Sequence, residues 1–185
     1  MITARTRMRA LRVGCVLAAI LAAGGCASGH TARPSPEATF LVVRHAEKAT
    51  DPGSPRDPPL SAAGEARARA LATRLSATPL VAVYATPWRR TRDTAAAAAA
   101  AHRLAVRSED PPDDATAYAR TLRARHRAGT VLIVGHSNTV PALVAALCDC
   151  DAPALGDADY GDLFLIEPVA NGSGRWRLQR QRFGQ

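Results

Sequence analysis

The sequence is poor in aromatic residues and in long hydrophobic runs, and each shortage excludes a class of protein. Aromatic side chains make up 4% of the 185 residues, which is too few for a stacking platform that binds single-stranded nucleic acid. No run of about 18 or more apolar residues occurs, which excludes a membrane-spanning channel or transporter. Apolar residues still make up 47% of the chain, enough to bury the core of one domain.

Acidic residues are missing from the start of the chain. None occurs before Glu37, whereas four arginines lie within the first twelve residues. They carry half of the formal net charge of +8. The remaining excess of basic over acidic residues is mild and does not by itself indicate nucleic-acid binding. The sequence therefore predicts no nucleic-acid partner.

The first 25 residues have the pattern of an export signal. An arginine-rich start precedes an apolar stretch over residues 13–23, and small residues follow it, as in a secretory signal peptide. The segment Ala23-Gly24-Gly25-Cys26 resembles a bacterial lipobox, with Ala23 in place of the usual leucine. The resemblance implies cleavage after residue 25 and lipidation of Cys26; ordinary signal cleavage that leaves Cys26 unmodified is the alternative.

We therefore predict a signal peptide over residues 1–25 and a flexible tether over residues 26–38, which are polar and contain proline. The domain itself would occupy residues 39–185. The protein would be exported to the bacterial cell envelope and held on the periplasmic side. Its contact with the membrane would be made only through the lipid anchor.

Cysteines are too few for a metal site in the predicted domain. Only Cys148 and Cys150 remain there, with no neighbouring ligand to complete a zinc site. We expect Cys148 to be a small buried apolar residue and Cys150 a loop thiol. A small disulfide between them, formed in an oxidising compartment, is the alternative.

Strand and helix patterns alternate from residue 39 onward. The predicted strands are 39–43, 80–84, 104–106, 130–134, 163–169 and 176–182. The predicted helices are 61–76, 87–101, 113–128 and 139–147. A turn over residues 171–174 would join the last two strands as a hairpin. The pattern predicts an α/β fold, a three-layer sandwich in which helices flank a mostly parallel central sheet.

Cationic and imidazole side chains follow the first, second and fourth predicted strands. They are Arg44 and His45, then Arg90, then His136. Because ligands of open α/β sheets bind beyond the carboxyl ends of the strands, these side chains should share one crevice. Arginine matches phosphate oxygens and stays charged, and a neutral histidine can act as a nucleophile. The set predicts phosphoryl transfer, in which arginines and histidines supply the charge and no metal or cofactor is needed.

The local sequences at these positions resemble those of the histidine phosphatase superfamily, the group that includes phosphoglycerate mutases and histidine acid phosphatases. Arg44-His45-Ala46 resembles the Arg-His-Gly motif of that family. Thr86-Pro87, with Arg90 three residues after the proline and Thr94-Ala95 beyond it, resembles the second motif. His136 in Gly-His-Ser-Asn-Thr resembles the third, and Pro59-Leu60-Ser61-Ala62-Ala63-Gly64 matches the family's helix start.

The resemblance implies a role for each residue of the set. His45 would be the nucleophile and form a phosphohistidine, which water then hydrolyses. Arg44 and Arg90 would bind the phosphoryl oxygens, and His136 would stabilise the group in transfer. The implied activity is metal-independent hydrolysis of phosphomonoesters. The implied partner is a small phosphorylated substrate, for which export suggests an envelope sugar phosphate.

Two other functions fit the same resemblance. One is a non-catalytic lipoprotein that binds a phosphorylated ligand with this fold. The other is a protein phosphohistidine phosphatase, which the short length of the chain favours and the predicted export disfavours.

The sequence departs from the family at two points. Ala46 replaces a glycine, which is tolerable if its backbone dihedrals are ordinary. The family's acidic proton donor lies in an insertion that is short here. The candidates for that donor are Glu109, Asp110, Asp113 and Asp114, none of which lies in a recognisable motif.

Three further residues adjoin the predicted site. Glu47 and Lys48 either tune the nucleophile or form a surface ion pair. Asn138 either hydrogen-bonds the substrate or caps the helix that follows it.

Overall fold

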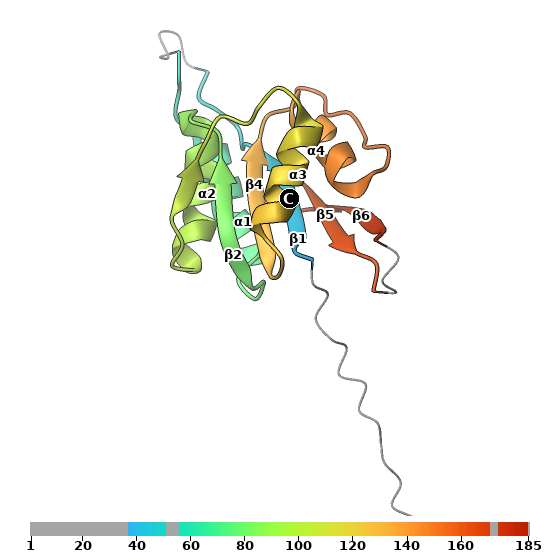
Figure 1. Ribbon diagram of the computed structural model, residues 1–185. Helices are drawn as coiled ribbons and strands as arrows, with labels where there is room; N and C mark the ends of the chain where they lie inside the picture. Colours follow the sequence, from blue (N-terminus) through green and yellow to red (C-terminus); the bar gives the residue numbers. More distant parts are fainter. Residues whose placement is uncertain (1–36, 51–55, 171–173, 185) are drawn as a thin grey trace, which may run out of the picture. The chain divides into compact units, whose positions relative to one another are not determined.

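The computed structural model describes residues 37–50, 56–170 and 174–184. These residues form one six-stranded sheet with helices on both sides (Figure 1). The strands are β1 (Thr39–Arg44), β2 (Leu80–Ala85), β3 (Val106–Ser108), β4 (Thr130–Gly135), β5 (Asp162–Pro168) and β6 (Trp176–Arg182). The helices are α1 (Ala62–Arg74), α2 (Arg89–Ala101), α3 (Ala115–Arg125) and α4 (Val140–Cys148).

The sheet has the strand order β3-β2-β4-β1-β5-β6. The first four strands in this order run parallel to one another, whereas β5 is antiparallel to β1 and β6 is antiparallel to β5. The predicted three-layer α/β sandwich with a mostly parallel sheet and a final hairpin is confirmed. The carboxyl ends of β3, β2, β4 and β1 consequently lie along one edge of the sheet.

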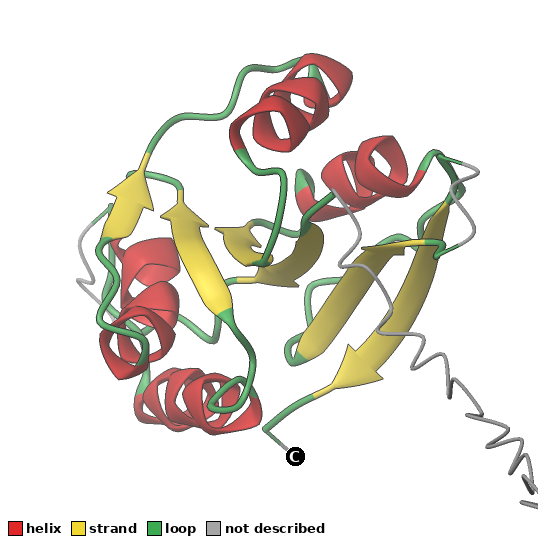
Figure 2. Ribbon diagram, turned by 60° about the horizontal axis from the view of Figure 1, so that its bottom comes forward, coloured by secondary structure: helices red, strands yellow, loops and turns green. Residues whose placement is uncertain are grey.

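Alternating side chains of each central strand build two separate cores. In β1, Phe40 and Val42 pack with residues of α3 and α4, whereas Leu41 and Val43 pack with residues of α1 and α2. Figure 2 shows helices on both sides of the sheet. Because both faces are covered, the central strands are nearly continuous apolar runs, as in other parallel sheets.

The predicted strand 104–106 was placed too early, and the end of α2 explains why. Arg103 adopts a left-handed conformation with φ of 56°, and the Leu104 N–H donates to the Ala99 carbonyl at 2.9 Å. This is the pattern of a helix C-terminal motif, in which the next apolar residue packs back on the helix. Leu104 therefore closes α2, β3 begins at Val106, and Glu109 directly follows the carboxyl end of β3.

Cys148 and Cys150 form a disulfide. The expectation of two free thiols is therefore wrong in this structure, and the disulfide given as the alternative is present. The burial expected for each residue holds, since Cys148 is buried and Cys150 is exposed.

Several predictions concern residues outside the described part of the chain. The signal peptide, Cys26 and the tether up to residue 36 lie there, as do residues 171–173 of the hairpin turn. Ala38 was assigned to the tether, but its side chain is 1% exposed and packs in the core beside β1. The packed domain therefore includes Ala38.

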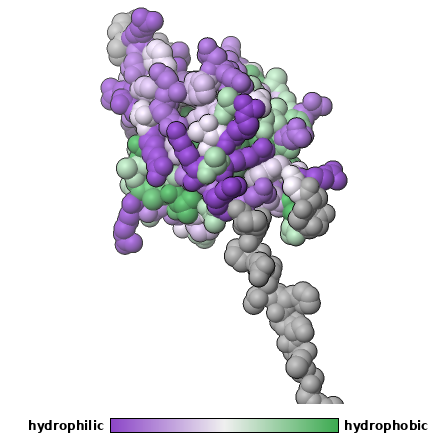
Figure 3. Space-filling model, in the orientation of Figure 1, coloured by the Kyte–Doolittle hydropathy of each residue, from purple (hydrophilic) through white to green (hydrophobic). Residues whose placement is uncertain are grey.

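Apolar side chains are scarce on the surface of the described residues. Hydrophilic residues cover most of the face shown in Figure 3. Among the described residues, Val81 is the one large hydrophobic side chain that is classed as exposed. None of the helices in this part of the chain is long and apolar enough to cross a bilayer.

Candidate active site

The four residues expected to share a crevice do come together at the carboxyl edge of the sheet. Arg44 is the last residue of β1, and His45 follows it. The His45 N–H donates to the Gly135 carbonyl of β4 at 2.9 Å, which joins the ends of the two strands. Arg90 lies in the first turn of α2, beyond β2, and His136 follows β4.

The imidazole of His45 is held with one nitrogen facing the site. Its Nδ1 lies 2.8 Å from the Ala46 carbonyl, so Nδ1 carries the hydrogen and donates it. The lone pair on Nε2 then accepts the Nε–H of Arg90 at 3.3 Å. This is the tautomer that a nitrogen nucleophile requires.

Burial keeps His45 neutral. The residue is 5% exposed, and burial lowers its pKa to about 4, although the bond to the Ala46 carbonyl acts to raise it. The neighbouring His136, Arg90 and Arg44 lower the pKa further. At neutral pH the lone pair on Nε2 is therefore free of a proton.

His136 is neutral for similar reasons but presents the opposite tautomer. Its ring centroid lies 5.3 Å from that of His45. Arg90 donates to its Nδ1 at 3.4 Å, so Nε2 carries the hydrogen and donates to Thr86 Oγ1 at 2.9 Å. Burial, followed by the charges of Arg90 and Arg44, lowers its pKa to about 4.

Each of the two arginines stacks on an aromatic ring. The Arg44 guanidinium lies 4.1 Å above the Tyr160 ring, and that of Arg90 lies 4.6 Å above the Trp88 ring. Arg44 Nη1 donates to the Gly156 carbonyl at 2.8 Å, whereas its buried Nε has no hydrogen-bond partner. A buried donor without a partner is costly, and an oxyanion could satisfy it.

Helix α2 positions the loop after His45 as well as Arg90. The hydroxyl of Thr94 accepts the Ala46 N–H at 2.9 Å and donates to the Arg90 carbonyl at 2.7 Å. Asp57 accepts the Arg89 N–H through both carboxylate oxygens, at 2.9 and 3.0 Å. Asp57 thus caps α2 from a distant loop, and its Oδ1 lies 3.9 Å from Arg90 Nη1.

The substitution of alanine for glycine at position 46 is accommodated as expected. Ala46 does not have a positive φ, so a side chain costs no backbone strain there. Its methyl group packs against Leu60 and Ala68.

Glu47 forms an ion pair, but not with Lys48. Its carboxylate lies 2.7 Å from Arg67 Nη2, and Arg67 Nη1 also donates to the Gly184 carbonyl at 2.9 Å. Burial acts to raise the pKa of Glu47, but the hydrogen bonds from Arg67, a backbone hydrogen bond and the charges of Arg67 and Arg44 together outweigh it, and the pKa is lowered. Lys48 is exposed, and its backbone bridges to Leu60. Through Arg67, Glu47 therefore connects the loop after His45 to α1 and to Gly184.

The structure separates the four candidate proton donors. Asp114 caps α3 by accepting the Thr116 and Ala117 N–H groups, and Asp110 is exposed outside the cavity beside the site. Glu109 and Asp113 line that cavity. The Glu109 carboxylate accepts the Tyr118 hydroxyl at 2.9 Å and pairs with Arg125 at 3.1 Å.

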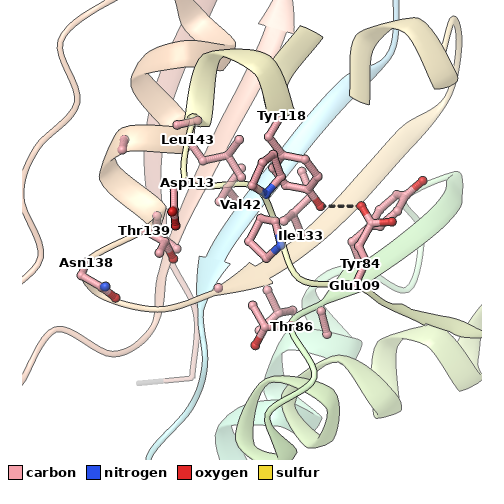
Figure 4. Close-up of a pocket in the computed structure, with 18 residues that line it drawn as sticks. Val42, Tyr84, Thr86, Glu109, Asp113, Tyr118, Ile133, Asn138, Thr139 and Leu143 are labelled. Carbon is pink, nitrogen blue, oxygen red and sulfur yellow. Dashed lines mark hydrogen bonds between the residues drawn. The ribbon is translucent and has the colours of Figure 1, made fainter. Parts of the chain in front are cut away.

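Asn138 lies exposed at the same cavity (Figure 4). The N-cap residue of α4 is Thr139, and it forms no side-chain capping bond. The capping role suggested for Asn138 is therefore wrong, and contact with a ligand remains a prediction.

The sequence analysis did not identify three residues of the site, namely Thr86, Asp57 and Tyr160. Thr86 lies inside the second motif, where its side chain had no evident task. Asp57 and Tyr160 lie in loops far from the motifs along the chain. The one available signal was the rarity of tyrosine, of which the chain has three. No group of three or more His, Cys, Asp or Glu that could hold a metal ion occurs within the described ranges.

Comparisons with known proteins show which family and which folds the chain resembles. The family model described as "Histidine phosphatase superfamily (branch 1)" matches residues 40–111. The protein histidine phosphatase SixA, solved with tungstate, is 22% identical with a TM-score of 0.63; the match covers 79% of this chain and 97% of that one. A mycobacterial glucosyl-3-phosphoglycerate phosphatase is 21% identical with a TM-score of 0.58, over 79% of this chain and 99% of that one. A search of curated proteins found no significant match.

The chain is therefore similar to the histidine phosphatase superfamily over residues 40–111, and its fold resembles that of the phosphatases compared above. The matched segment contains β1 from residue 40 to Arg44, His45 directly after it, and the helix that carries Arg90. His136 lies beyond the matched segment, and the fold brings it to the same site.

Proposed function

We propose that this protein is a phosphatase that hydrolyses phosphomonoesters through a phosphohistidine on His45. The observation that carries the proposal is the state of His45. It is buried and neutral, its Nδ1 is fixed on the Ala46 carbonyl, and its Nε2 faces the guanidinium of Arg90. A free lone pair beside fixed positive charge is the arrangement that attack on a phosphoryl group requires.

The reaction would proceed in two displacements. The Nε2 lone pair of His45 forms a bond to phosphorus as the ester P–O bond breaks, and the alcohol oxygen keeps the bonding electrons and takes a proton. Water then attacks phosphorus and loses a proton, and the N–P bond breaks with its electrons returning to Nε2. Arg44 and Arg90 would donate hydrogen bonds to the phosphoryl oxygens in both steps. His136 would do so once substrate binding turns its Nε2–H from Thr86 to a phosphoryl oxygen. Glu109 and Asp113 are the two candidates for the proton donor.

The phosphoenzyme can be tested by trapping. We expect brief mixing of the protein with a ³²P-labelled phosphomonoester to leave label on His45, in the presence or absence of EDTA, because arginines and histidines supply the charge. Alkaline denaturation and peptide mapping would locate the label. His45→Asn should carry no label, whereas His102→Asn, which changes a histidine at the far end of α2, should carry as much as the wild type. Turnover without label on His45, or loss of turnover in EDTA, would contradict the mechanism.

Hydrolysis of protein phosphohistidine is a second candidate function. It is supported by the match to SixA, which covers 97% of that chain. A phosphohistidine-bearing protein should then be dephosphorylated with a higher kcat/KM than any small ester. The third possibility, a binding lipoprotein without activity, predicts tight binding of tungstate with no turnover of either substrate.

We also propose that the protein is exported and lipid-anchored through Cys26, on the sequence pattern given above. Export would place the site among phosphorylated envelope components, which include sugar phosphates. Expressed in bacteria with an alkyne fatty acid, the wild-type protein should become labelled and sediment with membranes. Cys26→Ser should lose both properties, whereas Cys15→Ser should keep them. A Cys26→Ser protein that is still labelled would show that another residue carries the lipid.

A further inference from the structure

An apolar cavity of about 170 Å³ lies beside the catalytic groups. It is enclosed by the carboxyl ends of β2 and β4 and by the first turns of α3 and α4 (Figure 4). Its apolar walls are formed by Val42, Tyr118, Ile133, Val140 and Leu143. The cavity therefore offers apolar surface directly beside the proposed phosphate site.

Two residues belong both to this cavity and to the phosphate site. Thr86 lines the cavity, and its hydroxyl bonds His136 Nε2 at 2.9 Å. Gly135 also lines the cavity, and its carbonyl accepts the His45 N–H at 2.9 Å. A group in the cavity would therefore lie against residues that touch both histidines, where the alcohol part of a phosphate ester could be held.

The size of the cavity suits one six-membered ring. An apolar cavity of about 150 Å³ in another protein binds benzene. A sugar ring of similar size fits less well, because its hydroxyl groups would lose water against apolar walls without gaining partners.

The polar groups of the cavity disfavour a negatively charged alcohol. Its ionisable side chains are Tyr84, Glu109, Asp113 and Tyr118. Burial and the hydrogen bond to Glu109 raise the pKa of Tyr118, so its hydroxyl stays protonated and donates to that carboxylate. Arg125 forms an ion pair with Glu109, whereas Asp113 forms none with any residue that the structure describes. The positive charges of the site therefore act on the phosphate, while the cavity presents carboxylates.

We infer that this cavity is the subsite for the leaving group and that it selects phosphate monoesters of neutral alcohols with one apolar or aromatic ring. The inference rests on the proposed phosphatase function and deepens it. The occupant is the alcohol portion of the substrate itself.

The test compares esters of primary alcohols, so that the leaving groups are chemically alike. With the full-length protein we expect kcat/KM for benzyl phosphate to exceed that for ethyl phosphate by about tenfold or more, from burial of the ring. Glucose 6-phosphate and 4-carboxybenzyl phosphate should be poorer substrates than benzyl phosphate by a similar factor.

Two variants would fill the cavity from different helices. Ala115→Trp and Ala142→Trp both place a large ring at a residue that lines it, and each should bring the benzyl-to-ethyl ratio close to one while ethyl phosphate is still hydrolysed. Ala124→Trp, on α3 but outside the cavity, is the matched control and should keep the wild-type ratio. A wild-type ratio near one, or a ratio that both filling variants leave unchanged, would overturn the inference alone. Failure to hydrolyse any of the esters would overturn the phosphatase proposal and this inference with it.

Discussion

His45→Asn is expected to lower kcat/KM for 4-nitrophenyl phosphate by on the order of 10³-fold or more, because no other side chain can form the bond to phosphorus. The two arginines and His136 remain in this variant, so tungstate should still bind and protect it from unfolding. Steady-state hydrolysis and calorimetric titration with tungstate would measure the two effects. His102→Asn is the matched control and should retain wild-type activity. Activity in His45→Asn above about a tenth of the wild-type value would show that His45 is not the nucleophile.

The same variant should be less sensitive to acid than the wild type. Burial lowers the pKa of His45 from 6.5 to about 4. Between these two pH values His45 is protonated in the unfolded chain but neutral in the folded protein. The contribution of neutral His45 to the free energy of unfolding is therefore fully present above pH 6.5 and is lost as the pH falls from 6.5 to 4. Asparagine does not titrate, so the loss between pH 7 and pH 4.5 should be smaller in His45→Asn by about 2 kcal/mol.

Urea unfolding at a series of pH values measures this difference. His136 remains in both proteins and its pKa is also lowered, so His45→Asn should still lose some stability in acid. Equal losses in the two proteins would show that His45 titrates in the folded state as it does in the unfolded chain.

Gly64→Ala is expected to destabilise the protein, although alanine is the better helix former by about 1 kcal/mol. A Cβ at this position would lie 2.1 Å from the Glu47 carbonyl oxygen. That oxygen cannot simply move away, because it accepts the Ser61 N–H at 2.9 Å. We expect an overpacking cost of about 1–3 kcal/mol in the free energy of unfolding.

The clash should also reduce activity, because Glu47 lies two residues after the nucleophile. Displacing the loop by about 1 Å would misplace His45 against the phosphate, and kcat should fall by about 100-fold. Ala63→Gly, the reverse exchange at the exposed neighbouring position, should cost about 1 kcal/mol of stability and leave kcat unchanged. Urea unfolding and steady-state kinetics of both variants would measure this. A Gly64→Ala protein as stable and active as the wild type would show that the loop at Glu47 can move away from the added methyl group without loss of stability or activity.

Much of the fold could be read from hydrophobic patterns. The central strands are short apolar runs between helices, and that alternation leaves few arrangements other than a parallel sheet covered on both faces. The predicted strand 104–106 began two residues too early, because an apolar Leu104 that closes a helix has the same local pattern as the start of a strand. The misplacement hid the position of Glu109 at the carboxyl end of β3.

The sequence by itself predicted the candidate set, because Arg44, His45, Arg90 and His136 each lie at or beyond the carboxyl end of a strand and parallel strands end at one edge. Only the tertiary structure decided how these residues act. The tautomer of His45 depends on the Ala46 carbonyl, and the lowered pKa of each histidine depends on burial by other elements. Asp57, Tyr160 and the apolar cavity reach the site from loops and helices distant along the chain. Such contacts arise from packing between segments, and no local pattern encodes them.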